Sequence, residues 1–310
     1  MKLKNMNGKT LRAGLVCAAL AATAGCVTFS DYRPFPPSAD DAAERALRDS
    51  LTFYAGFDNG LDADFAKGDP TLYSAPSSRD RNEGVALPGL PGEGHVKELV
   101  GQGRFGNALQ WTKKAKPVVF FRGPENMGFK SRDWSASVSL WMRLNPDKDL
   151  EPGYCDPFQF VGENWGDGSV FIEFTKENPR SFRFVQMAIT KLWNPTGAKY
   201  EEIPLGQRPL VQVEKPPFSA EEWTHVVFTF EHANTGQKDG VGRLYLNGEY
   251  QGAIAGFNSS VGWTPEKAAI NLGLNYIGGL DDIAVFDRAL TAEEAKWIHD
   301  GGGPLGELLD

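Results

Sequence analysis

Short runs in which every second residue is apolar constrain the fold of this chain more than any other feature. In the first run, Leu51, Phe53 and Phe57 share one side of an extended chain. Further runs lie at residues 138–144, 170–174, 226–230, 244–246 and 283–285. Because successive side chains of a β-strand point to opposite faces, a period of two indicates strands with one buried face. The sequence from residue 51 onward therefore predicts antiparallel β-structure.

Residues typical of tight turns separate these runs. They cluster at residues 164–168, 194–197, 247–248 and 278–279, and the chain contains 35 Gly and 20 Pro. Asn247-Gly248 lies between two strand-like runs and predicts a two-residue hairpin, since a type I′ turn needs positive φ at both positions. Many short strands joined by tight turns predict an all-β fold, a two-sheet antiparallel sandwich.

Two segments depart from the alternation and predict helices. Residues 38–47 combine polar capping residues with an Ala-rich stretch, which predicts a short N-terminal helix. Thr291 and Glu294 have the spacing of a capping box, which predicts a short C-terminal helix through about His299. The sandwich is thus expected to carry one short helix near each end.

The first 26 residues have the composition of an export signal. Basic residues precede residues 13–25, which are small or apolar and too few to span a bilayer as a helix. The sequence Thr23-Ala24-Gly25-Cys26 resembles a bacterial lipobox, in which Cys26 is acylated and becomes the mature N-terminus. The alternative is an ordinary secretory signal. We expect a signal peptide at residues 1–25, a tether with a short helix at 26–49 and the sandwich domain at 50–305.

The predicted acylation also sets the expected location and partners. Acyl chains on Cys26 anchor a protein to a membrane without a transmembrane helix, so we expect the cell envelope, at the outer membrane or cell surface. Without acylation the protein would be secreted. A net charge of −8 repels phosphate backbones and argues against nucleic acid as a partner.

Several segments carry a more specific pattern. They are residues 51–60, Gly-x-x-Gly-x-Ala-Leu at 103–109, the run around Trp141, Trp-x-His-Val at 223–226, Leu-Tyr-Leu-Asn-Gly at 244–248, and residues 278–290. In this order they resemble the laminin-G-like jelly-roll family within the concanavalin A-like lectin and glucanase superfamily. The resemblance covers roughly residues 50–302 and implies a jelly-roll sandwich. It implies no single function, because this fold hosts lectins, adhesive modules and hydrolases.

The carboxylate spacing of the hydrolases on this fold is missing from the sequence. Those enzymes use a Glu-x-Asp-x-x-Glu type of pattern on one strand. Glu173 and Glu177 lack the central Asp, and we interpret them as solvated surface. Cys155 lies in a loop-like stretch at residues 154–157 without an evident base beside it, and His225 fits a structural position in a strand. We therefore expect no catalytic residue, and an enzyme is the less favoured class.

The resemblance also implies a place for a metal ion. Many members of the superfamily hold a structural Ca²⁺ where the first and last strands lie side by side, and Ca²⁺ takes oxygen ligands. The matching candidates are Asp58 after the first run, and Asp282 and Asp281 in the last. The alternative is that these side chains serve turns, which Asp favours for its local hydrogen bonds.

Tryptophans with polar neighbours are the candidate ligand-binding residues. Trp165 lies beside Asn164 and Asp167, and Trp193 precedes another Asn. Trp141 points away from the apolar face of its run, so it either lines the second surface of a sheet or packs under a loop. Aromatic rings flanked by amides and carboxylates suit sugars, although packing is the more common role of tryptophan.

These observations favour a non-catalytic extracytoplasmic binding module anchored as a lipoprotein. Its expected partner is a polysaccharide or glycoconjugate. Two alternatives stay open: a glycan-active hydrolase with a dispersed site, and an adhesive or structural module that binds another protein. An exposed aromatic groove would favour glycan, whereas a broad apolar patch would favour protein.

Overall fold

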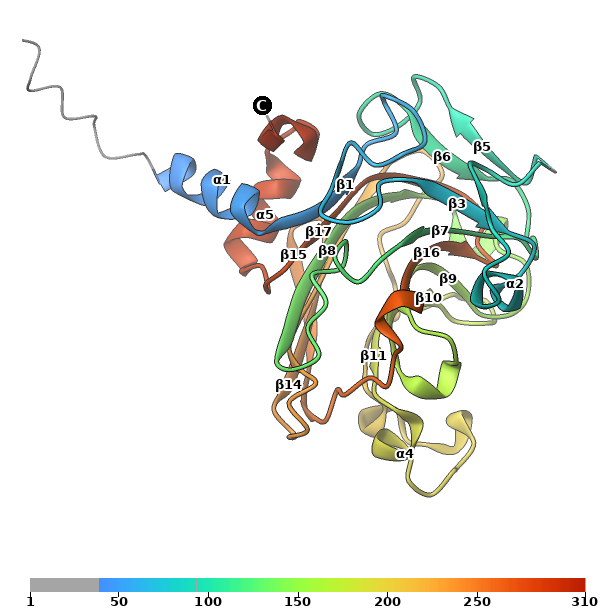
Figure 1. Ribbon diagram of the computed structural model, residues 1–310, viewed down its shortest axis with the longest axis vertical. Coiled ribbons are helices and arrows are strands. Elements are labelled where there is room, and N and C mark those ends of the chain that lie inside the picture. Colours follow the sequence, from blue (N-terminus) through green and yellow to red (C-terminus); the bar gives the residue numbers. More distant parts are fainter. Residues whose placement is uncertain (1–38, 93, 310) are drawn as a thin grey trace, which may run out of the picture. The chain divides into compact units, whose positions relative to one another are not determined.

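The computed structural model describes residues 39–92 and 94–309 (Figure 1). The predicted signal peptide, the lipid site at Cys26 and most of the predicted tether lie outside these residues. Within the described part of the chain, no helix is long and apolar enough to cross a membrane.

Two antiparallel sheets contain all of the strands of the described chain. Among the described residues the first sheet has nine strands. Its main order is β15 (Glu249–Phe257), β14 (Gly240–Leu246), β13 (Thr224–Ala233), β8 (Trp134–Arg143), β17 (Gly278–Phe286), β1 (Leu51–Ala55) and β2 (Phe65–Ala66). In addition, β6 (Ala108–Trp111) pairs with β17, and β5 (Val96–Leu99) pairs with β6.

The second sheet has eight strands in the described chain. Its order is β12 (Leu210–Val213), β11 (Phe182–Met187), β10 (Ser169–Phe174), β9 (Cys155–Val161), β16 (Ala269–Leu274), β7 (Val118–Arg122), β3 (Leu72–Ala75) and β4 (Leu87–Pro88). Neighbours in space that are distant in sequence, such as β9 and β16, show the crossing connections of a jelly roll. The predicted fold class, an all-β jelly-roll sandwich, is confirmed.

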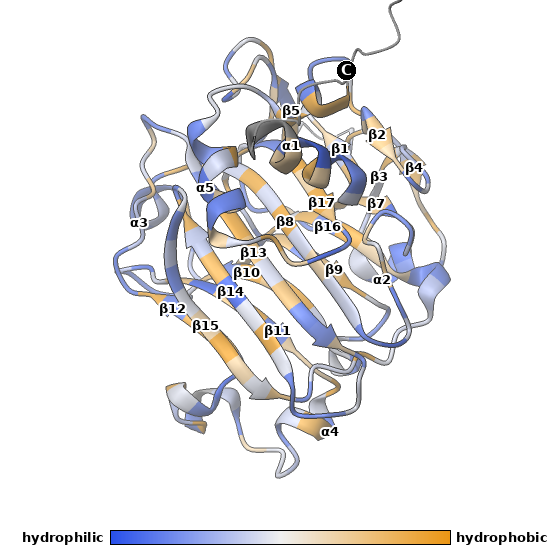
Figure 2. Ribbon diagram, turned by 90° about the vertical axis from the view of Figure 1, so that its left-hand side faces the viewer, coloured by the Kyte–Doolittle hydropathy of each residue, from blue (hydrophilic) through white to orange (hydrophobic). Residues whose placement is uncertain are grey.

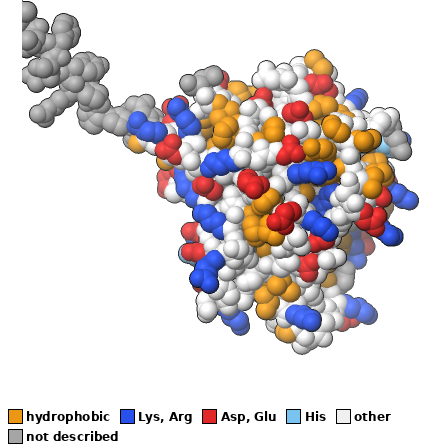
Figure 3. Space-filling model, in the orientation of Figure 1, with side chains coloured by type: hydrophobic (Ala, Val, Ile, Leu, Met, Phe, Trp, Pro, Cys, Tyr) orange, Lys and Arg blue, Asp and Glu red, His pale blue; other side chains and the backbone are white. Residues whose placement is uncertain are grey.

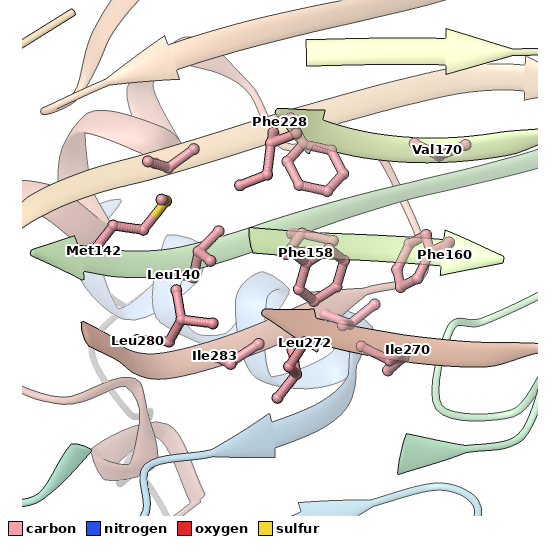
Figure 4. Close-up of a cluster of buried hydrophobic side chains, with 14 of the residues drawn as sticks. Leu140, Met142, Phe158, Phe160, Val170, Phe228, Ile270, Leu272, Leu280 and Ile283 are labelled. Carbon is pink, nitrogen blue, oxygen red and sulfur yellow. The ribbon is translucent and has the colours of Figure 1, made fainter. Parts of the chain in front are cut away.

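The core lies between the two sheets. Figure 4 shows Leu140 of β8 and Leu280 of β17 in the same cluster as Phe158 of β9 and Ile270 of β16. These side chains occupy alternate positions of their strands, as the period of two predicts. Each fully buried Leu, Ile or Phe contributes about 1.5–3 kcal/mol relative to an exposed one. With no disulfide available to the buried free Cys155, this burial is the main source of stability.

Short helices lie outside the sheets. Helices α1 (Ala39–Ser50) and α5 (Ala292–Asp300), with the 3₁₀ turn η5 (Leu305–Leu309), lie on the outer face of the first sheet (Figure 2). The connections hold α2 (Ser78–Asn82), α3 (Pro146–Asp149) and α4 (Thr190–Trp193), and the 3₁₀ turns η1 (Trp165–Asp167), η2 (Tyr200–Glu202), η3 (Leu205–Gln207) and η4 (Pro265–Lys267). Acidic and basic side chains are mixed over the face seen in Figure 3.

Local predictions about turns and helix ends are confirmed. Asn247 and Gly248 have φ of 50° and 75° and join β14 to β15, as a type I′ turn requires. Thr291 and Glu294 form the reciprocal hydrogen bonds of a capping box at the start of α5. The N-terminal helix extends to Ser50, directly before β1, and its Leu47 is buried against the first sheet.

Candidate functional site

A pocket of about 350 Å³ opens on the outer face of the second sheet. The alternation along β10 creates its floor: Val170, Ile172 and Phe174 face the core, so Phe171 and Glu173 face outward. Its wall residues come from the loops that carry η1, α4 and η2. The lining residues are Tyr154, Asp156, Trp165, Phe171, Glu173, Met187, Thr190, Trp193, Asn194 and Tyr200. We name this cavity the Trp193 pocket.

One wall is Trp165, whose loop (residues 162–168) is fixed at three points. Arg81 donates a hydrogen bond to the Gly162 carbonyl at 2.6 Å, and the Trp263 indole donates to the Gly168 carbonyl at 2.8 Å. Glu163 pairs with Lys267 at 2.6 Å. The Trp165 side chain is nevertheless 57% exposed and rests against Phe171, with ring centroids 5.4 Å apart. A large ring held by a rigid loop offers an apolar face at little entropic cost.

The opposite wall is the segment between β11 and β12. Trp193 of α4 contacts Tyr200 edge to face, with centroids 6.0 Å apart, and the Arg208 guanidinium lies 4.6 Å from the Tyr200 ring. Asn194 supports the turn, since its side-chain amide donates to the Ala198 carbonyl at 2.8 Å. Trp165 and Trp193, predicted from two separate segments, therefore line the same pocket.

The floor contains two buried carboxyl groups on neighbouring strands. Asp156 of β9 accepts a hydrogen bond from Gln159 at 2.5 Å through Oδ2. Gln159 in turn accepts from Asn271 of β16 at 3.3 Å, and Asn271 accepts from Arg81 at 2.9 Å. Glu173 pairs with Arg183 of β11 at 3.1 Å. Polar groups thus form a row across the outer face of this sheet.

The electrostatics of the floor favour an uncharged Asp156. Burial raises its pKa well above the ordinary value, and the nearby Glu173 carboxylate adds to the rise. The pKa of Glu173 is also raised by burial, although Arg183 opposes that effect. Among the described residues, Asp156 Oδ1 and the Tyr200 hydroxyl have no hydrogen-bond partner. Buried polar atoms of this kind are costly unless a ligand or water binds them.

Comparison with known proteins places this fold in a family. Residues 125–296 match the model of the Concanavalin A-like lectin/glucanases superfamily. The chain belongs to this superfamily. The search among curated proteins gave no significant match.

Solved structures agree with the concanavalin A-like fold. The receptor binding domain of a botulinum neurotoxin C/D mosaic serotype has a TM-score of 0.52 at 12% identity, covering 83% of this chain and 55% of that one. The receptor binding domain of botulinum neurotoxin D has a TM-score of 0.52 at 11% identity, covering 82% of this chain and 53% of that one. The chain thus spans about half the length of these toxin domains. At such identities the likeness shows the fold alone.

A third structure is an arabinanase domain. Domain 4 of a GH43 extracellular arabinanase from Geobacillus stearothermophilus, solved with arabinotriose, has a TM-score of 0.45 at 16% identity. The match covers 80% of this chain and 97% of that domain.

The other predicted ligand residues of this concanavalin A-like domain differ in position. Asn164 and Asp167 lie in the Trp165 loop and bond to each other, Asn164 Nδ2 donating to Asp167 Oδ2 at 2.8 Å. Trp141 is 2% exposed on the outer face of the first sheet, between the Arg104–Phe105 loop and His299 of α5. It packs under a loop, one of the two arrangements that its strand position predicts, and presents no ring face to a ligand.

The predicted metal ligands accept protein hydrogen bonds. Asp281 accepts from the main-chain N–H groups of Arg104 at 2.6 Å, Phe105 at 3.1 Å and Asp282 at 2.8 Å. Asp282 accepts from the Tyr54 hydroxyl at 2.6 Å, and Asp58 accepts from the Asn107 N–H at 2.6 Å. Within the described chain no group of three or more His, Cys, Asp or Glu side chains could hold a metal ion. Calcium binding at these residues therefore stays a prediction.

Two interpretations of the sequence are corrected here. Glu173 is buried and ion-paired rather than solvated, because Arg183 lies directly opposite it on β11. Residues 155–157 belong to strand β9 rather than to a loop. A register shift in the β9–β10 pairing, opposite Pro157, admits a residue that lacks an N–H donor. Asp156, Phe171, Met187 and Tyr200 were missed, although the alternation at 170–174 already placed Phe171 on the outer face.

Proposed function

We propose that this domain binds carbohydrate in the Trp193 pocket and does so without catalysis. The observation that supports it is the combination of two tryptophan walls with a floor of buried polar groups. Sugar rings have apolar C–H faces that stack on aromatic rings, and their hydroxyl groups bond to carboxyl and amide oxygens. Asp156 Oδ1 and the Tyr200 hydroxyl supply polar atoms that lack protein partners.

A glycan and polysaccharide binding screen tests this proposal with a matched pair of variants. Trp165→Ala removes the exposed wall of the pocket, and we expect a loss of affinity of about tenfold or more, as for an aromatic hot spot. The control is Tyr250→Ala on the first sheet, since Tyr250 is 56% exposed and Trp165 57%. The control should bind as the wild type does. Equal binding by wild type and Trp165→Ala would refute the pocket, and wild type that binds no glycan would favour the adhesive alternative.

A hydrolase is the second candidate, because the floor holds two carboxyl groups. Glycoside hydrolysis needs one carboxylic acid to protonate the leaving oxygen and one carboxylate to attack or to activate water. The raised pKa of Asp156 suits the acid, and the arginine-paired Glu173 would be the carboxylate. Release of reducing ends from a bound polymer measures turnover. Turnover that Asp156→Asn abolishes would establish the enzyme, whereas binding without turnover supports the binding module.

We further propose that the module is held at the cell envelope by acyl chains on Cys26. The lipobox-like sequence that ends at Cys26 supports this proposal. Labelling with a fatty-acid analogue should mark the wild-type protein and leave Cys26→Ser unlabelled. An unlabelled mature protein, or label kept by Cys26→Ser, would contradict it.

A further inference from the structure

Three cavities on the outer face of the second sheet follow one another through shared lining residues, and the Trp193 pocket is the first of them. A cavity of about 170 Å³, the Arg81 pocket, shares Trp165 with it. A third cavity of about 400 Å³, the Lys116 pocket, shares Ser78 and Leu274 with the Arg81 pocket. The order of the strands β11, β10, β9 and β16 gives the order of the cavities, so the three form one row.

The first two cavities share a wall and a floor. The exposed Trp165 ring lies between them, and the hydrogen-bonded chain Arg81–Asn271–Gln159–Asp156 connects their floors. Each floor also holds a buried polar atom without a partner in the described chain. In the Arg81 pocket it is the Ser169 hydroxyl, and in the Trp193 pocket it is Asp156 Oδ1. Because such atoms lie in two adjacent cavities, a ligand longer than one sugar unit would satisfy both.

The third cavity differs in charge. The Lys116 pocket is lined by Arg79, Lys114 and Lys116, with no acidic residue in its lining. Lys114 donates to the Pro152 carbonyl at 3.1 Å, and Lys116 is exposed. Arg79 pairs with Glu83, but both side chains are largely exposed, so that pair is weak. A basic cavity on a chain of net charge −8 is a local exception that suits an anion.

We infer that the three cavities bind one extended oligosaccharide, and that its unit in the Lys116 pocket carries an acidic group. This inference rests on the proposed carbohydrate function and names the class of glycan. Trp165 stacks on a sugar between the first two cavities, and the lysine ammonium groups bind the anion at the far end. Carboxylate and sulfate share this chemistry, and charge-assisted hydrogen bonds to either stabilise the complex more than neutral ones do.

Binding of matched polymers by calorimetry tests the inference. The probes are polygalacturonate and its methyl ester, in which a methyl group removes the charge of each carboxylate, and chondroitin sulfate before and after desulfation. We expect at least one acidic probe to bind about tenfold more tightly than its matched neutral or desulfated form, with the preferred pair identifying carboxylate or sulfate. Affinity for oligogalacturonates, or for chondroitin oligomers if sulfate is preferred, should rise with chain length and then level off.

Variants separate this inference from the proposed function. Lys114→Ala/Lys116→Ala should remove the preference for the acidic form and keep the affinity for the neutral form. Lys130→Ala/Lys238→Ala removes the same charge from exposed positions outside the cavities and should change neither. An unchanged preference in the first double variant, or no preference in wild type, overturns the acidic site while the Trp165→Ala result still decides carbohydrate binding. Affinity independent of chain length overturns the extended site.

Discussion

The outer faces of the two sheets have opposite construction. On the first sheet, α1, α5 and η5 cover an apolar cluster that includes Leu51, Phe286 and Ile298. Among the described residues, the second carries two small apolar clusters, one around Phe171 and Val185 and one around Val118 and Phe120. Polar groups fill the strand positions between them. Cavities lie over these polar groups.

The difference supports the proposal that the first face serves stability and the second serves recognition. Apolar burial stabilises the fold in proportion to the area removed from water. A buried polar atom without a partner instead costs about 1–3 kcal/mol. Trp141 Nε1 and His225 Nδ1 on the first face lack partners in the described chain too, but they are enclosed by protein. Asp156 Oδ1 and Ser169 Oγ on the second face instead line cavities, where a bound ligand can satisfy them.

The largest expected effect is a loss of stability on removing a buried side chain from the helix-covered face of the first sheet. Phe286→Ala removes a fully buried ring of β17 and should lower the free energy of unfolding by about 3–5 kcal/mol, measured by denaturant unfolding. Glycan affinity should stay unchanged where the variant is folded. Phe171→Ala is the matched variant, because Phe171 is equally buried but forms the pocket floor. It should lose both stability and affinity, and loss of affinity in Phe286→Ala would contradict the division between the faces.

The sequence predicts those features of the two outer faces that depend on neighbouring residues, and it does not predict those that depend on packing between distant segments. Period-two alternation is local, so strands such as β8 and β10 and the inward side of each could be predicted. Which outer face a helix covers depends on packing between distant segments. Trp141 illustrates this: its strand position fitted a sheet surface or a site under a loop equally well, and α5 with the Arg104 loop decides.

The candidate site was predictable only at its rim. Trp165 and Trp193 could be predicted as ligand-binding residues because they lie among turn residues, where an aromatic side chain is not needed for packing within a strand. Asp156 and Glu173 were hidden for physical reasons. Pro157 made β9 resemble a loop, and the partner that buries Glu173 is Arg183, on the next strand. A charged side chain is predicted to be solvated unless the oppositely charged residue beside it on the neighbouring strand is known.

The second effect is a dependence of stability on pH, caused by two buried carboxyl groups of the first sheet. Burial raises the pKa of Asp281 to about 8 and that of Asp282 to about 7. The unfolded chain ionises both groups near their ordinary value, so the folded protein binds more protons and stability falls as pH rises towards 8. Between about pH 6.5 and pH 8.5 we expect these two groups to cost about 2–3 kcal/mol, measured by unfolding at each pH.

A variant tests that assignment. Asp282→Asn keeps an acceptor for the Tyr54 hydroxyl and should reduce the fall in stability by about 1 kcal/mol. The chosen pH range avoids His225, whose pKa burial lowers to about 3, since that group destabilises the fold only as pH falls below its ordinary value. A stability that rises with pH across this range would exclude the assignment.

A smaller effect tests calcium. An ion bound to Asp58, Asp281 or Asp282 only in the folded state would stabilise it by about 1.4 kcal/mol at ten times its Kd. Thermal melts with Ca²⁺ and with chelator measure this, and Asp58→Ala is the matched variant because Asp58 is exposed. A higher midpoint in Ca²⁺ that Asp58→Ala removes would support the predicted ion. Equal midpoints would contradict it and leave the N–H groups of the Arg104 loop as the partners of Asp281.

The smallest expected effect is a change in glycan affinity on replacing Asp156, on the outer face of the second sheet. Asp156→Asn keeps an oxygen for Gln159 and an uncharged side chain at this position, so affinity at mildly acidic pH should stay within about threefold of wild type. As pH rises, wild-type Asp156 ionises without a cationic partner of its own, and its charge opposes both folding and an acidic glycan. Wild-type affinity should therefore fall with rising pH more steeply than that of the variant. Parallel pH profiles would show that Asp156 does not face the ligand, which would leave Trp165 and Trp193 as the binding surface.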